Sequence, residues 1–98
     1  MPQLVSLAVL ALAHAFDWAS FVVMINKHGL AAEANPIVVQ LAEATGLPGL
    51  TLAKIATVAF AAILMLLIAP RRRKLALGLL MFGIAAGLVG GISNVATI

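Results

Sequence analysis

Three ionisable residues lie inside long apolar segments of this sequence, where a charge is costly: His14, Asp17 and Lys54. Asp17 lies eight residues before Ile25, and Lys54 lies seven residues after Leu47. At 1.5 Å per residue of helix, Asp17 lies roughly 12 Å before the end of the first apolar segment, and Lys54 lies roughly 10 Å after the start of the second. These two ends are joined by one connecting segment, so the two charges should lie at nearly the same level. Since an unpaired charge near mid-bilayer costs about 2.5–3.5 kcal/mol on insertion scales, we predict an ion pair between Asp17 and Lys54.

Two interpretations of this pair are open. In the first, a buried salt bridge sets which helices pack together, with His14 and the hydroxyls of Thr51 and Thr57 completing its hydrogen bonds. In the second, the pair belongs to a proton or ion path in which His14 changes charge, because imidazole titrates near physiological pH. The spacing His14-x-x-Asp17, with Glu33 further along, also holds nitrogen and oxygen donors. It matches no established metal motif, so we expect neither a metal nor a cofactor.

Two further polar residues, Glu33 and Asn35, precede Pro36. Asn and Pro in this order are typical of the N-cap and first position of a helix, and a carboxylate there favours the positive helix N-terminus. Capping alone therefore explains both residues. In the alternative, the loop dips inward, so that Glu33 and Asn35 meet Lys54 and close a polar pocket under the outer interface. The candidate buried polar cluster is thus His14, Asp17, Glu33, Asn35 and Lys54.

The elements that would position these side chains are long apolar helices. The 98 residues are 64% hydrophobic and 9% charged, with a mean hydropathy of +1.20, far outside the usage of soluble globular proteins. A span needs roughly 20 residues, so the length allows about three spans and little else. We predict an all-α membrane protein of one domain, residues 1–98, with spans at about 4–25, 47–69 and 75–96. Residues 36–45 are predicted to form a short interfacial helix between the first two spans.

A basic turn separates the second and third spans, and it contains four of the six basic residues: Arg71, Arg72, Arg73 and Lys74. Cytoplasmic loops of membrane proteins carry an excess of Lys and Arg. We therefore predict that this turn and the N-terminus are cytoplasmic and that the C-terminus is external, in the cell (inner) membrane. The net charge of +3 gathers where it would face anionic headgroups, so the expected partner is the lipid bilayer and not nucleic acid.

The first apolar segment also has one feature of a cleaved signal peptide, because Ala13-His14-Ala15 fits the small-x-small cleavage pattern. The start, Met1-Pro2-Gln3, lacks the basic residues of such a peptide, and apolar sequence continues past the supposed cut to Ile25. We therefore expect the segment to remain attached as a span.

The third span contains three glycines at four-residue spacing, Gly83, Gly87 and Gly91, with Ala86 and Gly90 beside them. Glycines at this spacing let two helix backbones approach closely, and close packing drives helix association in lipid. We predict that this stripe packs against another helix. That helix belongs either to the same chain or to a second copy, and the sequence leaves both possibilities open.

The order of polar residues resembles a family of small prokaryotic membrane proteins with three or four spans, classed as a domain of unknown function. The shared features are an intramembrane Asp, a Gly-x-x-x-Glu-x-Asn-Pro segment and a Lys early in the second span, here Asp17, Gly29, Glu33, Asn35, Pro36 and Lys54. The resemblance covers roughly the first two thirds of the chain. It implies that these residues form one unit, and it implies no activity. Members tend to have Thr four residues after the Asp, where this chain has Phe21, with Ser20 one position earlier.

Three classes of function remain. An accessory or assembly subunit, packing against itself or a larger membrane complex, needs only spans, a packing face and a register-setting ion pair, and we favour it. The alternative is an oligomeric channel, a holin-like protein or a proton- or ion-conducting protein using His14, Asp17 and Lys54. A pore, however, should present a longer polar face than the third span offers. An enzyme is not expected, since hydrolysis needs paired carboxylates, a Ser/His arrangement or a metal motif, and Asp17 is the only carboxylate clearly within a span.

Overall fold

The computed structural model describes residues 3–33 and 35–98, and these residues form helices joined by short turns. The elements are α1 (Gln3–His28), the short 3₁₀ helix η1 (Leu30–Ala32), α2 (Pro36–Ile68) and α3 (Arg73–Thr97). Each of the three α-helices is long and apolar enough to cross a membrane. The structure thus agrees with an all-α protein that has three candidate spans. Met1 and Pro2, cited above against a signal peptide, lie outside the described residues.

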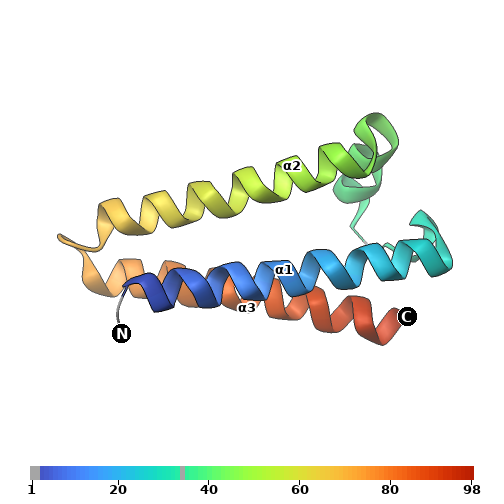
Figure 1. Cartoon of the computed structure of the whole chain (residues 1–98). Coiled ribbons are helices and arrows are strands. Elements are labelled where there is room, and N and C mark those ends of the chain that lie inside the picture. Colours follow the sequence, from blue (N-terminus) through green and yellow to red (C-terminus); the bar gives the residue numbers. More distant parts are fainter. Residues whose placement is uncertain (1–2, 34) are drawn as a thin grey trace.

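The short helix predicted at 36–45 is not a separate element, because these residues form the first part of α2. Helical geometry is interrupted within α2 at Gly46, which has φ 73° and ψ −174°. Figure 1 shows the part of α2 before this point turned away from the long part that follows. Glycine tolerates the positive φ without a Cβ clash, and Pro48 is accommodated in the first turn after the break. Gly46 is therefore a kink that divides α2 into a first part, residues 36–45, and the long part that follows.

Short turns join the helices at both ends of the bundle. Gly29 follows α1 with a φ of 77°, although its ψ of 178° is extended and not left-handed helical. His28 Nε2 lies 2.9 Å from the carbonyl oxygen of Ile98, so the ends of α1 and α3 meet. At the opposite end of the bundle, the four side chains of the basic turn are all exposed. The basic turn and the loop after α1 thus lie at opposite ends of the molecule (Figure 1).

The glycine stripe of α3 packs against α1 of the same chain. The two helices run side by side in the same direction, with α2 antiparallel to both (Figure 1). A Cβ at Gly87 would lie 2.9 Å from the carbonyl carbon of Ala13, and a Cβ at Gly91 would overlap the ring of Phe16. One turn earlier, a Cβ at Gly83 would lie 3.0 Å from Leu10 Cδ1 of α1. Of the two partners left open by the sequence, the structure therefore contains the intramolecular one.

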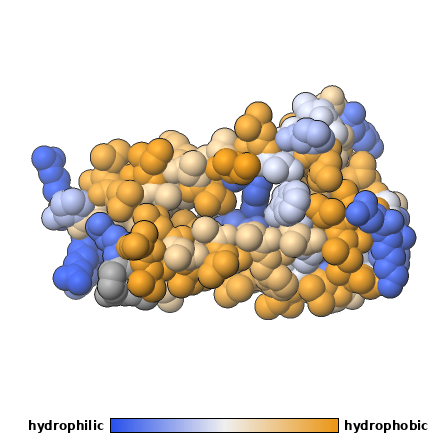
Figure 2. Space-filling model, viewed as in Figure 1, coloured by the Kyte–Doolittle hydropathy of each residue, from blue (hydrophilic) through white to orange (hydrophobic). Residues whose placement is uncertain are grey.

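An apolar core fills the half of the bundle nearer the basic turn. It is built from all three helices, with Leu10 from α1, Met65 from α2, and Ala76 and Leu80 from α3. The outside of the bundle carries large exposed apolar side chains, and Figure 2 shows apolar surface along the middle of the molecule with hydrophilic surface at both ends. This distribution is the one expected of helices whose outer faces contact lipid.

Candidate functional site

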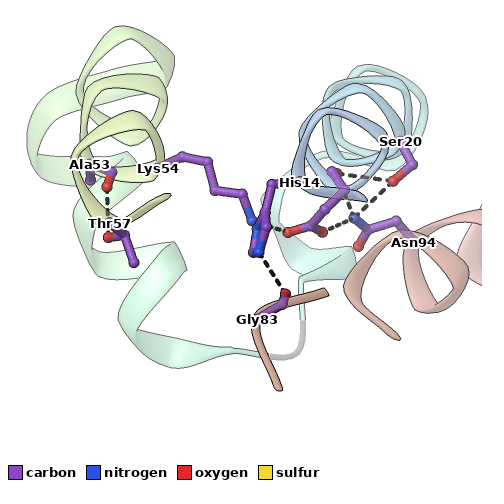
Figure 3. A network of polar contacts seen from close by, with 8 residues as sticks. His14, Ser20, Ala53, Lys54, Thr57, Gly83 and Asn94 are labelled. Atoms are coloured by element: carbon purple, nitrogen blue, oxygen red, sulfur yellow. Dashed lines mark hydrogen bonds and ion pairs between the residues drawn. The ribbon is translucent and has the colours of Figure 1, made fainter. Parts of the chain in front are cut away.

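The ion pair predicted from the matched depths is present between α1 and α2. Lys54 Nζ lies 2.5 Å from Asp17 Oδ2, and the two side chains are 26% and 22% exposed, respectively. Figure 3 shows Lys54 reaching from α2 across to the α1 side of the bundle. Because both groups are largely shielded from solvent, each offsets much of the cost of burying the other.

Asn94 of α3 is the second partner of Asp17. Its Nδ2 lies 3.2 Å from Asp17 Oδ1, 3.1 Å from the Asp17 carbonyl oxygen and 3.2 Å from Ser20 Oγ. Asn94 as a whole is 8% exposed, so these bonds are made in a buried setting. A Cβ at Gly90, one turn earlier, would lie 2.5 Å from Asp17 Oδ1, so glycine leaves room for the carboxylate. Asp17 thereby links all three helices, through Lys54 to α2 and through Asn94 to α3.

His14 bonds to the backbone of α3. Its Nε2 lies 2.8 Å from the carbonyl oxygen of Gly83, as Figure 3 shows. A carbonyl only accepts, so Nε2 must carry a proton, which assigns the tautomer of a neutral ring. Among the described residues, Nδ1 is buried without a hydrogen-bond partner. The expectation that His14 completes the hydrogen bonds of the ion pair is therefore wrong, because the ring is turned toward α3.

The threonines near Lys54 also make different bonds from those expected. Thr51 Oγ1 donates to the Leu47 carbonyl at 2.9 Å, and Thr57 Oγ1 donates to the Ala53 carbonyl at 2.8 Å. Each hydroxyl thus bonds back to its own helix, the common arrangement for threonine within a helix. Thr51 Oγ1 in addition accepts the indole N–H of Trp18 at 2.9 Å, which adds a second polar link between α1 and α2.

Glu33 and Asn35 have the geometry of a helix cap. Asn35 Oδ1 accepts the backbone N–H of Ile37 at 3.0 Å, and Glu33 Oε1 accepts the backbone N–H of Asn35 at 3.0 Å. This is the capping interpretation of the two residues. Both side chains also border the same cavity as Lys54, and neither is hydrogen-bonded to it within the described part of the chain.

A cavity of about 370 Å³ lies among these residues. Its polar wall brings together the five residues of the candidate cluster and adds Asn94. Its apolar wall includes Trp18, Phe21, Val38, Leu41 and Leu50. In Figure 2 hydrophilic surface is visible at the bottom of a hollow on an otherwise apolar side of the molecule. The cluster predicted from the sequence is therefore gathered around one space, although its members are not all bonded to one another.

A family model described as Domain of unknown function (DUF5658) matches residues 8–98. The chain belongs to this family. The match includes most of α1 and all of α2 and α3, and therefore every residue of the cavity wall named above. No curated protein and no solved structure matches the chain. The family assignment agrees with the resemblance noted from the sequence, while the motif that suggested it remains a prediction.

Within the family match, Asn94 and Trp18 are the site residues that sequence reasoning missed. No role was predicted for Asn94 from the sequence. The spacing of Asn94 could have indicated its role. Asn94 follows Gly91 by three residues and Gly87 by seven, so it lies on the same face of the helix as these glycines. A polar side chain on the face that packs against α1 should have been expected to meet a polar partner there.

A second cavity, of about 460 Å³, lies between α1 and α2 and shares His14, Trp18 and Lys54 with the first. The rest of its wall includes Ile55, Val58 and small alanines. The two helices pack against each other at few points, which leaves this space between them. Within residues 3–33 and 35–98, no group of three or more His, Cys, Asp or Glu side chains is placed to hold a metal ion.

Proposed function

We propose that this protein is a small, non-enzymatic membrane protein that acts as an accessory or assembly subunit, and that a helix of its partner packs against α2. The observation that carries this proposal is the exposure of α2. Of its most apolar stretch of 18 residues, 6% is buried, against 28% for α1 and 22% for α3. Helices in lipid associate through close packing, and α2 gains little of it within this chain. A partner helix on α2 would supply the missing packing.

The ion pair is given a structural role in this proposal. Both Asp17 carboxylate oxygens already accept a hydrogen bond, from Lys54 and from Asn94, and Glu33 accepts one from the chain at the start of α2. The Asp17 carboxylate thus links the three helices, and the Glu33 carboxylate stabilises the turn before α2. This supports a non-enzymatic role, since hydrolysis needs a second acid or base facing the same reacting atom.

The alternative, a proton or ion path, finds less support in the packing. The polar cluster lies in the half of the bundle nearer the loop after α1, and the apolar core of Leu10, Met65, Ala76 and Leu80 fills the other half. Within the described residues, Ser6 is the one buried polar side chain of α1 before His14. A conducting path needs polar groups or water across the full thickness, so the core would have to open.

Crosslinking at two matched positions tests the proposed partner. Phe60 on α2 and Phe82 on α3 are 68% and 74% exposed, so each can be replaced by a photoreactive phenylalanine analogue without opening the core. In native membranes we expect a crosslink to a different protein from position 60 and only lipid adducts from position 82, read by mass spectrometry. Adducts to a second copy of this chain, or lipid adducts alone at both positions, would contradict the accessory role.

We propose the inner membrane as the location, with the basic turn and the N-terminus in the cytoplasm and the C-terminus outside. The chain has no cysteine, so Arg72→Cys and Ala31→Cys each introduce a single thiol, at opposite ends of the bundle. In intact cells we expect an impermeant thiol reagent to label Ala31→Cys at once and Arg72→Cys only after permeabilisation. Rapid labelling of Arg72→Cys in intact cells would reverse the orientation.

A further inference from the structure

The cavity of about 370 Å³ contains hydrogen-bonding capacity that the fold leaves unused. The Lys54 ammonium has three N–H donors, and one of them bonds Asp17. Its side chain is 26% exposed and borders both cavities, so the remaining donors are accessible from them. The Asp17 carboxylate, by contrast, already accepts from both Lys54 and Asn94. The fold thus leaves Lys54 donors free for an acceptor on a ligand, and it leaves the acceptor His14 Nδ1 without a partner among the described residues.

The charges around the cavity restrict that acceptor to a neutral group. The wall holds two carboxylates, Asp17 and Glu33, and one ammonium, Lys54, which sum to −1 with His14 neutral. An anionic head would lie beside both carboxylates and would be repelled in this low-dielectric setting. A cationic head would lie beside the Lys54 ammonium, which already occupies the Asp17 carboxylate. A neutral carbonyl oxygen can accept from Lys54 while the ion pair stays intact.

The remaining walls suit a flat, apolar ring. Trp18 and Phe21 contribute aromatic surface, and Leu41 and Leu50 contribute aliphatic surface. The volume of about 370 Å³ lies within the range of small-molecule sites, which are mostly apolar with a few placed polar groups. Aromatic side chains favour stacked or edge contacts with another ring. Because Trp18 Nε1 is bonded to Thr51, the indole is held in place beside the cavity.

The second cavity provides a place for an apolar tail. It meets the first at His14, Trp18 and Lys54, and apart from Thr51 the rest of its wall is apolar side chains of α1 and α2. One of these, Ile55, is 60% exposed on the outer face of the bundle, where lipid would lie. We propose that the two cavities together bind a neutral, lipid-soluble molecule of the quinone class, with a ring carbonyl accepting from Lys54 and the tail between α1 and α2.

The single tryptophan makes this proposal directly measurable. Trp18 is the only tryptophan of the chain and borders both cavities, so its fluorescence reports on bound quinone. The probe is decyl-ubiquinone, titrated into the full-length protein in detergent micelles, with decanol as the control for the tail. We expect saturable quenching by decyl-ubiquinone and none by decanol.

A matched pair of variants separates binding from partition into the micelle. Ala53 borders the cavity, whereas Ala56, one turn of α2 further on, is exposed and borders neither cavity. Ala53→Leu should fill part of the site and weaken quinone binding about tenfold or more, and Ala56→Leu should leave binding unchanged. Linear quenching of equal size in wild type and both variants would overturn the proposal. A competition experiment could also overturn it. If decyltrimethylammonium displaced the quinone at a lower concentration than a second quinone does, the site would prefer a cation.

Infrared spectroscopy of the wild-type complex provides a second test that needs no variant. A carbonyl that accepts from Lys54 should absorb at lower frequency than the carbonyl of decyl-ubiquinone in empty micelles, because the hydrogen bond weakens the C=O bond. An unshifted carbonyl band at saturating protein would show that the proposed bond to Lys54 is absent, whatever the folding of Ala53→Leu.

Discussion

Asp17→Asn and Lys54→Met are each expected to destabilise the folded protein by about 2.5–3.5 kcal/mol, the cost of leaving one charge unpaired at membrane depth. Combining them should recover part of that loss, because the double variant contains neither charge. In Lys54→Met, Asp17 keeps its bond from Asn94, whereas in Asp17→Asn the Lys54 ammonium loses its carboxylate partner. The measurement is a double-mutant cycle on unfolding in mixed micelles, together with the yield of monodisperse protein.

Lys27→Met and Glu43→Gln serve as matched controls for this cycle, because both side chains are exposed. The first substitution removes one positive charge and the second removes one negative charge. Neither should change stability by more than about 0.5 kcal/mol. Strictly additive losses in the double variant would mean that Asp17 and Lys54 do not stabilise each other. If the pair also takes part in function, the double variant should fold and yet lose the crosslink from position 60 or the binding of quinone.

Gly87→Leu is expected to separate α1 from α3 and to cost about 3 kcal/mol, the upper end of the usual range for overpacking. The reason is that the first atom of the new side chain would meet backbone and not a flexible side chain: its Cβ would lie 2.9 Å from the carbonyl carbon of Ala13. Backbone cannot move aside without shifting a helix, so Asn94 and His14 would lose their bonds across the α1–α3 contact as well.

Gly78→Leu is the control on the same helix, since nothing lies within 4 Å of the Cβ position at Gly78. It should be neutral or slightly stabilising, because leucine has a higher helix propensity than glycine. Both variants are compared by thermal unfolding in detergent and by the native mass of the particle. Equal stability of the two variants would show that the glycine stripe faces lipid and not α1.

The sequence by itself determined the long helices and the level of the two charges along them. Apolar runs long enough to span, bounded by Gly29 and by Pro70, correspond to helices in the structure because backbone groups in lipid can only be satisfied by helices or closed barrels. Helical rise is constant, so counting residues from the ends of the runs was enough to place Asp17 and Lys54 level with each other. The caps at Asn35 and Pro36 are also local, which is why they could be predicted.

The tertiary structure decided how those elements meet. Sequence spacing indicated that Gly83, Gly87 and Gly91 share a face, but packing against α1 depends on which helix fits most closely in three dimensions. That contact in turn brings Gly83 and Asn94 to α1, giving His14 a backbone carbonyl and Asp17 a second donor. The bonded residues are 69 and 77 positions apart along the chain. The periodicity of one helix cannot predict contacts between residues so far apart. The cavity beside Lys54 follows from the same cause, because α1 packs closely on α3 and only sparsely on α2.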